Sequence, residues 1–132
     1  MNKKALAGWI LSALIALFLF AGGARGKFYE LPEREERLAQ IEGKERMVTT
    51  EVVAEYGIFE VVAVLLFLIP HTAFIGAILL SAYLGGAVAT HDRIESWILP
   101  IAIGVLVWVA LGLRDNRVFA NAFSRPRPKG ET

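Results

Sequence analysis

Long stretches without a charged residue are the feature that most limits how this 132-residue chain can fold. Three such stretches, Ala5–Ala24, Thr72–Thr90 and Ser96–Leu113, are 20, 19 and 18 residues long. A fourth stretch, Val52–Ile69, is equally apolar except for two glutamates. A helix needs about 20 mostly apolar residues to cross the hydrocarbon core of a bilayer. The sequence therefore predicts four transmembrane helices, at about 5–24, 52–69, 72–90 and 96–113.

The connections between these stretches predict how the helices are arranged. The first connection, residues 25–51, is long and polar, whereas Pro70 and His71 alone separate the second and third stretches. Short connections make the last three helices antiparallel neighbours. We expect an all-α fold, namely an integral membrane four-helix bundle with a long polar loop between helices 1 and 2. Residues 1–115 would form the bundle, and residues 116–132 a basic, disordered tail.

The first stretch and the long loop each allow a second interpretation. The first stretch has the basic start of a signal peptide, but the apolar region of a signal peptide is usually only about 7–15 residues long. In the loop, Pro32 and Gly43 suit the beginning and end of a short helix. That helix would be a solvated surface helix or a lid on the mouth of the bundle.

Composition and motifs exclude several classes of chemistry. The chain has no cysteine, which rules out disulfides, thiolate catalysis and cysteine-ligated metal by this chain. Two histidines are too few for a histidine-rich metal site, so no metal is expected. A net charge of +1 gives no field that would attract nucleic acid. No phosphate-binding, dinucleotide-binding or serine-nucleophile motif is present, so the sequence leaves open whether the protein is an enzyme.

Small residues predict where helices approach each other closely. In lipid, helix association depends on small residues that allow close backbone contact. They recur every four residues in the third stretch and, more briefly, in the first. The helix-packing candidates are Gly8, Ser12, Ala77, Ser81, Gly85 and Ala89. We expect the third helix to be the most buried, with its small face against that of the first helix, within one chain or across a homo-oligomer.

Glu60 is the most informative single residue, because a carboxylate at membrane depth is costly and marks a candidate functional site. It should face the interior of the bundle and be paired or protonated. Polar residues that would lie on the same side of the membrane are Arg25, Lys27 and His91, with Tyr83 nearer the middle. These five residues form a candidate polar pocket, or else a buried pair that only fixes the helix register.

Several segments together resemble the DoxX-like family of small membrane proteins. They are Gly57-Ile58-Phe59-Glu60, the run ending in Leu68-Ile69-Pro70, Gly85-Gly86 through His91, Trp108 and Leu113-Arg114-Asp115. The resemblance implies a mostly bacterial four-helix membrane protein, some of whose relatives are membrane subunits of quinone-linked oxidoreductases. Its glutamate and histidine positions correspond to Glu60 and His91, with no catalytic role to transfer.

Three functions follow as expectations. The first is a membrane subunit or accessory of a redox system, with quinone as the cofactor and a redox protein as partner. The second is a small carrier or binding protein for a lipid or small solute, and the third is a structural or assembly protein. The basic N-terminus favours the bacterial inner membrane with both termini in the cytoplasm, although Lys and Arg otherwise divide evenly between the two sides.

Overall fold

The computed structural model describes residues 1–24, 50–91, 97–124 and 130, and every regular element in this part of the chain is a helix. The elements are α1 (Lys3–Phe18), the π-helical segment η1 (Leu19–Ala24), α4 (Thr50–Leu68), α5 (Ala73–His91), α6 (Ile98–Arg114) and α7 (Arg117–Phe123). The predicted all-α class is confirmed. The four long helices begin and end within about two residues of the four predicted stretches, with η1 completing the first. The predicted loop helix lies outside the described residues.

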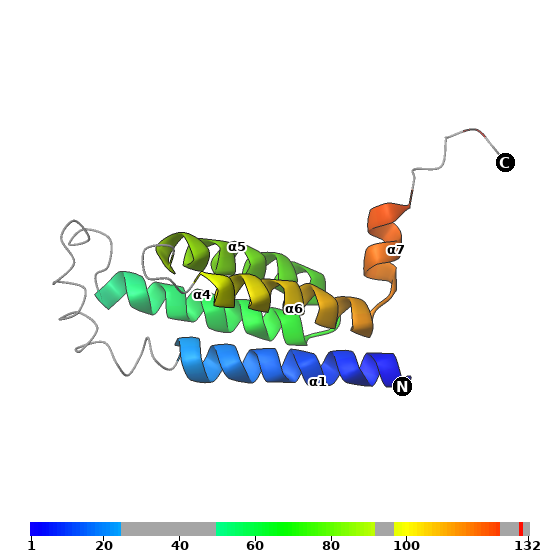
Figure 1. The fold of residues 1–132 in the computed structure, drawn as a ribbon, viewed down its shortest axis with the longest axis horizontal. Coiled ribbons are helices and arrows are strands. Elements are labelled where there is room, and N and C mark those ends of the chain that lie inside the picture. The colour runs from blue at the N-terminus through cyan, green and yellow to red at the C-terminus, as the bar shows by residue number, and fades with distance from the viewer. Residues whose placement is uncertain (25–49, 92–96, 125–129, 131–132) are drawn as a thin grey trace.

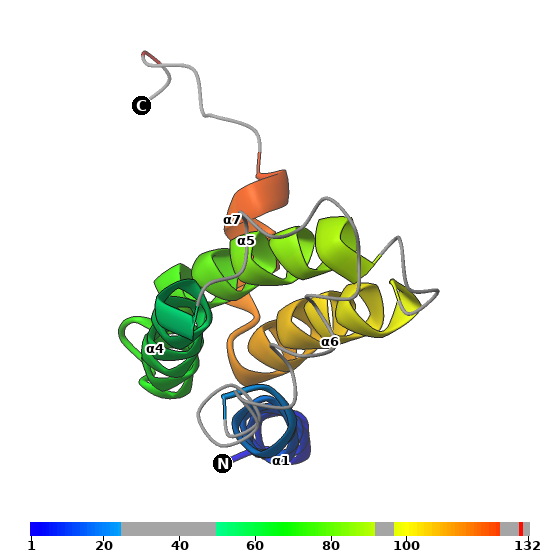
Figure 2. The same cartoon turned by 90° about the vertical axis from the view of Figure 1, so that its left-hand side faces the viewer.

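The four long helices lie side by side and enclose one apolar core (Figure 1). Viewed end-on, they follow each other around the core in the order α1, α6, α5 and α4 (Figure 2). α1 packs chiefly against α6, while η1 brings its C-terminal end against α4. Phe67, Leu80 and Val107, from three different helices, are fully buried at the centre.

A glycine in the first turn of α5 allows the closest approach between helices α4 and α5. A Cβ atom at Gly76 would collide with the backbone of α4 at Leu66 and Phe67. The turn before it is closed by the hydroxyl of Thr72, which donates to the carbonyl oxygen of Leu66 at 2.9 Å. The tight turn and the glycine together fix how α5 runs back along α4.

The predicted contact between the small faces of the first and third helices is wrong within one chain. α1 lies diagonally opposite α5 (Figure 2), and its Gly8 instead faces α6, where a Cβ would come within 2.8 Å of the Arg114 nitrogen. On α5, Ala77 is buried and Ser81 half-buried, but Gly85 and Ala89 are exposed. Small residues permit close approach without specifying the partner helix, which explains the error. The contact across a homo-oligomer stays a prediction.

The predicted disordered tail is wrong over its first part, because Arg117–Phe123 forms α7. α7 turns away from α6 by 103°. Its Phe119 ring lies against Gly112, where a Cβ would collide with the ring, and Val118 packs against the core. These contacts order a segment whose composition alone predicted disorder. Residues 125–129 and 131–132 lie outside the described residues.

Within the described residues, fewer single helices are long and apolar enough to cross a membrane than the sequence predicted. Among the described residues, one helix, Lys3–Gly22, is long and apolar enough. α6 and α7 pass the same test only as one bent unit, and Ala73–Ala89 is apolar but shorter. Membrane crossing by all four long helices therefore stays a prediction.

We predict that Gly76→Ala lowers the free energy of unfolding by about 1–3 kcal/mol, because the added methyl group has no space beside α4. Gly85→Ala, on the same helix, is the matched control, since its Cβ would enter open space. It should be at least as stable as wild type, because alanine is a better helix former than glycine where the methyl group has space. Unfolding followed by circular dichroism in mixed detergent micelles measures both, and equal losses would contradict the close approach.

Candidate functional site

Glu60 occupies the middle of α4 and faces the interior of the protein. Its side chain is 1% exposed. Among the acidic residues whose exposure the structure describes, Glu60 is the one that is buried. It follows Thr50 by ten residues and precedes Leu68 by eight, which places it about 15 and 12 Å from the two ends of the helix. Glu55, by contrast, is exposed. Glu60 therefore lies near the middle of α4, away from both ends of that helix.

Tyr83 on α5 supplies a hydrogen bond to this carboxyl group. Its hydroxyl donates to Oε2 of Glu60 at 2.8 Å, a bond that connects two helices near their midpoints. Phe59 lies beside the Tyr83 ring, with centroids 6.4 Å apart. A buried carboxyl group without a hydrogen bond would cost several kcal/mol, so this bond is a condition for placing Glu60 here.

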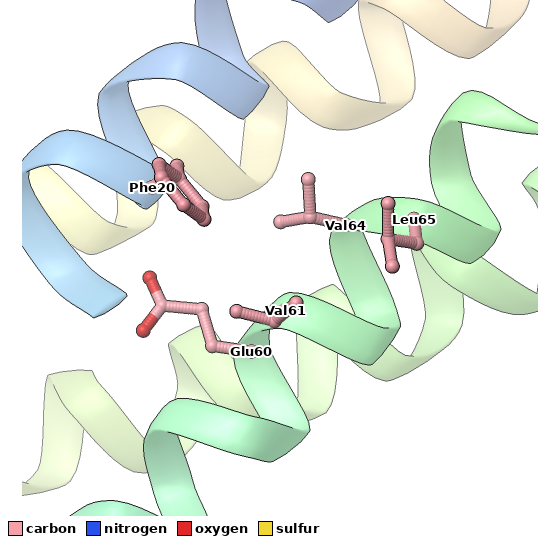
Figure 3. A pocket seen from close by; sticks show the side chains of 5 residues that line it. All are labelled: Phe20, Glu60, Val61, Val64 and Leu65. Carbon is pink, nitrogen blue, oxygen red and sulfur yellow. The ribbon is translucent and has the colours of Figure 1, made fainter. Parts of the chain in front are cut away.

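A small pocket opens beside the carboxyl group, between η1 and α4. Its volume is about 60 Å³, and Phe20, Glu60, Val61, Val64 and Leu65 line it. In Figure 3 the Glu60 carboxyl group points away from Val61, Val64 and Leu65. Every other lining side chain is apolar, and Phe20 and Leu65 are 58% and 55% exposed, so they border the outer surface. The surface of the pocket is apolar throughout, so Glu60 borders it with the hydrocarbon part of its side chain while its oxygens stay covered.

This arrangement has defined chemical abilities. A carboxyl group accepts hydrogen bonds when ionised and donates one when protonated, while a phenol both donates and accepts. Glu60 and Tyr83 together can therefore hold a proton, and the carboxyl group can hydrogen-bond a carbonyl or hydroxyl oxygen that is brought within reach of it. π-Helical segments such as η1 are frequent at functional sites. The pocket volume accommodates only a few atoms until Phe20 moves.

Arg114 forms a second polar centre, at the end of the helices that holds the N-terminus. Its guanidinium group donates to the carbonyl oxygens of Phe67 at 2.8 Å and Leu68 at 3.3 Å, the last residues of α4. It also donates to Ser12 Oγ at 3.3 Å and lies 3.8 Å from the centroid of the Trp9 ring. A cation is favourable at the C-terminus of a helix, where carbonyl groups lack intrahelical partners. Arg114 thereby joins α6, α4 and α1.

A third polar contact connects α5 with α6. The indole of Trp108 donates to Ser81 Oγ at 2.9 Å, and Ser81 donates to the carbonyl oxygen of Ala77 at 2.8 Å. Phe74 packs edge-on against the Trp108 ring. Ser81, predicted as a small packing residue, therefore also satisfies a polar group of the neighbouring helix.

Of the five predicted pocket residues, the structure brings Glu60 and Tyr83 together. Arg25 and Lys27 lie outside the described residues, and α5 ends at His91, whose side chain is not described. Sequence reasoning missed Phe20 as a pocket residue and Arg114 as an interhelical ligand of carbonyl groups. A basic residue in the last turn of an apolar stretch was the available signal for Arg114, whereas nothing in the sequence distinguished Phe20 from other apolar residues.

Comparison with known proteins identifies the family. The model of the DoxX-like family matches residues 10–112, which is most of the chain, from within α1 to near the end of α6. The chain therefore belongs to the DoxX-like family, as the sequence motifs indicated, and this family is associated with membranes. Neither a curated protein nor a solved structure matches the chain.

Proposed function

We propose that the protein is an integral membrane protein in which all four long helices cross the bacterial inner membrane as one bundle. The support is the apolar outer surface of each helix: Ile10, Leu65, Ile75 and Val105, one from each, are 54–58% exposed. Extended apolar surface is unfavourable in water and natural against lipid tails. The lipid bilayer is then the first partner of this surface.

Within that membrane, we propose that the protein is a subunit or accessory of a quinone-linked redox system. The observation that carries this proposal is the Glu60–Tyr83 pair, a buried carboxyl group hydrogen-bonded to a phenol beside a pocket that opens toward lipid. Quinones are lipophilic and carry ring oxygens that need hydrogen-bond partners. Movement of the exposed Phe20 side chain would enlarge the pocket enough for a ring.

The residues of the site fit such a group through the Glu60 carboxyl group. Once Phe20 has moved, this group can accept from a ring hydroxyl group, or donate to a ring oxygen when it is protonated. The Tyr83 hydroxyl group donates to Glu60 and holds the carboxyl group in place. A bound quinone would supply the electron-transfer chemistry, which the cysteine-free chain itself lacks. Glu60, held by Tyr83, would orient the ring and hold a proton, and the apolar lining would exclude water. A redox partner protein would complete the system.

We predict that wild-type protein purified from carbonate-washed membranes retains quinone, and that Glu60→Gln retains about tenfold less, because the amide replaces one of the two carboxyl oxygens that can hydrogen-bond the ring. Solvent extraction and chromatography measure quinone per protein. Glu55→Gln is the matched control, since Glu55 is an exposed acid on the same helix. Absence of quinone from the wild type, or equal quinone in Glu60→Gln, would contradict the proposal.

A structural or assembly role is the second candidate, and the same hydrogen bond favours it, because that bond connects α4 with α5. Under this alternative Glu60→Gln would lower thermal stability in a protein that binds no ligand. The quinone measurement therefore separates the two candidates.

We also propose that both termini lie in the cytoplasm. The start of α1 and the end of α6 lie at the same end of the molecule (Figure 1), as an even number of crossings requires. The basic start of α1, with Lys3 and Lys4, favours the cytoplasm for this end, although Lys and Arg divide evenly between the two sides over the whole sequence.

The absence of cysteine makes this orientation directly testable. We predict that single cysteines placed by Asn2→Cys and Ser124→Cys, both at exposed positions, resist a membrane-impermeant maleimide in intact cells. Both should react once the membrane is opened. Labelling of either cysteine in intact cells would contradict the proposed orientation.

A further inference from the structure

The short helix α7 divides into a polar and an apolar face. Arg117 and Asn121 are four residues apart and share one face, because residues at this spacing lie one above the other on a helix. Val118, Phe119, Ala122 and Phe123 occupy the opposite side. α7 is therefore amphipathic over its full length.

The packing of α7 shows which face points toward the core. Phe119 lies against Gly112 of α6, and Val118 packs against the apolar core. Phe123 shares the side of Phe119 but is 84% exposed. Since α7 makes an angle of 103° with α6, it lies across the axes of the long helices (Figure 1). In a bilayer it would run parallel to the membrane plane, with its apolar side toward the hydrocarbon, as interfacial helices do.

The charges at this end are almost all positive. We define the terminal face as the described residues Met1–Lys4, Ile69–Thr72 and Asp115–Ser124. Lys3, Lys4 and Arg117 are exposed on it. Within the described part of the chain, Asp115 is the acidic residue of the terminal face. Its Oδ1 accepts a hydrogen bond from the backbone nitrogen of Arg117 at 2.9 Å. Arg114 is held by carbonyl groups and Trp9, so the three exposed cations carry the outward charge.

We propose that the terminal face binds the head groups of anionic phospholipids, with α7 lying at head-group depth. Charge complementarity identifies the occupant: three exposed cations, Lys3 and Lys4 at the start of α1 and Arg117 on α7, lie at this end of the molecule, where the apolar side of α7, including Phe123, faces the hydrocarbon. Basic residues near a membrane surface each strengthen binding to anionic lipid about fivefold. This inference rests on the proposed membrane location and adds a lipid class and a binding surface to it.

Native mass spectrometry of the full-length protein in a neutral detergent tests the proposal, with added phosphatidylglycerol or phosphatidylcholine. The wild type should bind phosphatidylglycerol at least about tenfold more strongly than phosphatidylcholine. Combined replacement by Lys3→Gln, Lys4→Gln and Arg117→Gln should remove this preference. The matched control, Lys3→Arg, Lys4→Arg and Arg117→Lys, keeps the charges and should keep the preference.

Each other outcome would overturn the proposal. Equal binding of the two lipids by the wild type, or an unchanged preference in the triple glutamine variant, would show that the terminal face does not select anionic head groups. Displacement of phosphatidylglycerol by inorganic phosphate would identify a site for the free anion instead. Failure of the membrane proposal is seen separately, as loss of the wild-type protein from carbonate-washed membranes.

Discussion

The hydrogen bond from Tyr83 to Glu60 is the contact between α4 and α5 on which the candidate site depends. A carboxyl group in the middle of an apolar core has a large desolvation cost, and hydrogen bonding within the core must offset it. The phenol reaches the carboxyl group only because Gly76 lets α5 approach α4 and the turn at Thr72 sets where α5 begins. The backbone geometry at the start of α5 thus helps to set which side chains meet near the middles of α4 and α5.

The guanidinium group of Arg114 is also hydrogen-bonded within the protein, but its role is to connect helices. It is surrounded by carbonyl oxygens, a hydroxyl group and an indole ring, and it connects three helices at one end. Glu60, in contrast, borders a pocket that opens toward the outer surface. Arg114 is therefore interpreted as a structural residue, and Glu60, which borders the pocket, as a candidate binding residue.

Much of the fold was predictable because the four apolar stretches are bounded by charged residues, and helices in such stretches are strongly determined by length. The inward orientation of Glu60 was predictable, because an ionisable side chain in an apolar transmembrane helix is costly against lipid and faces the interior of the bundle instead. The neighbour of α1 was not, because Gly8 and Ser12 fit any helix that approaches closely, and α6 supplied Arg114 to that surface. The order in α7 and the role of Phe20 both arise from tertiary contacts that no local pattern encodes.

The central claim is that Glu60 and Tyr83 act as one hydrogen-bonded unit, and a double-mutant cycle tests it most directly. The cycle measures the free energy of unfolding in mixed micelles for wild type, Glu60→Gln, Tyr83→Phe and the double variant. Tyr56→Phe, an exposed tyrosine on α4, is the control for the loss of a phenol. The account predicts a coupling energy of at least about 1 kcal/mol. Additive effects within about 0.3 kcal/mol would contradict it.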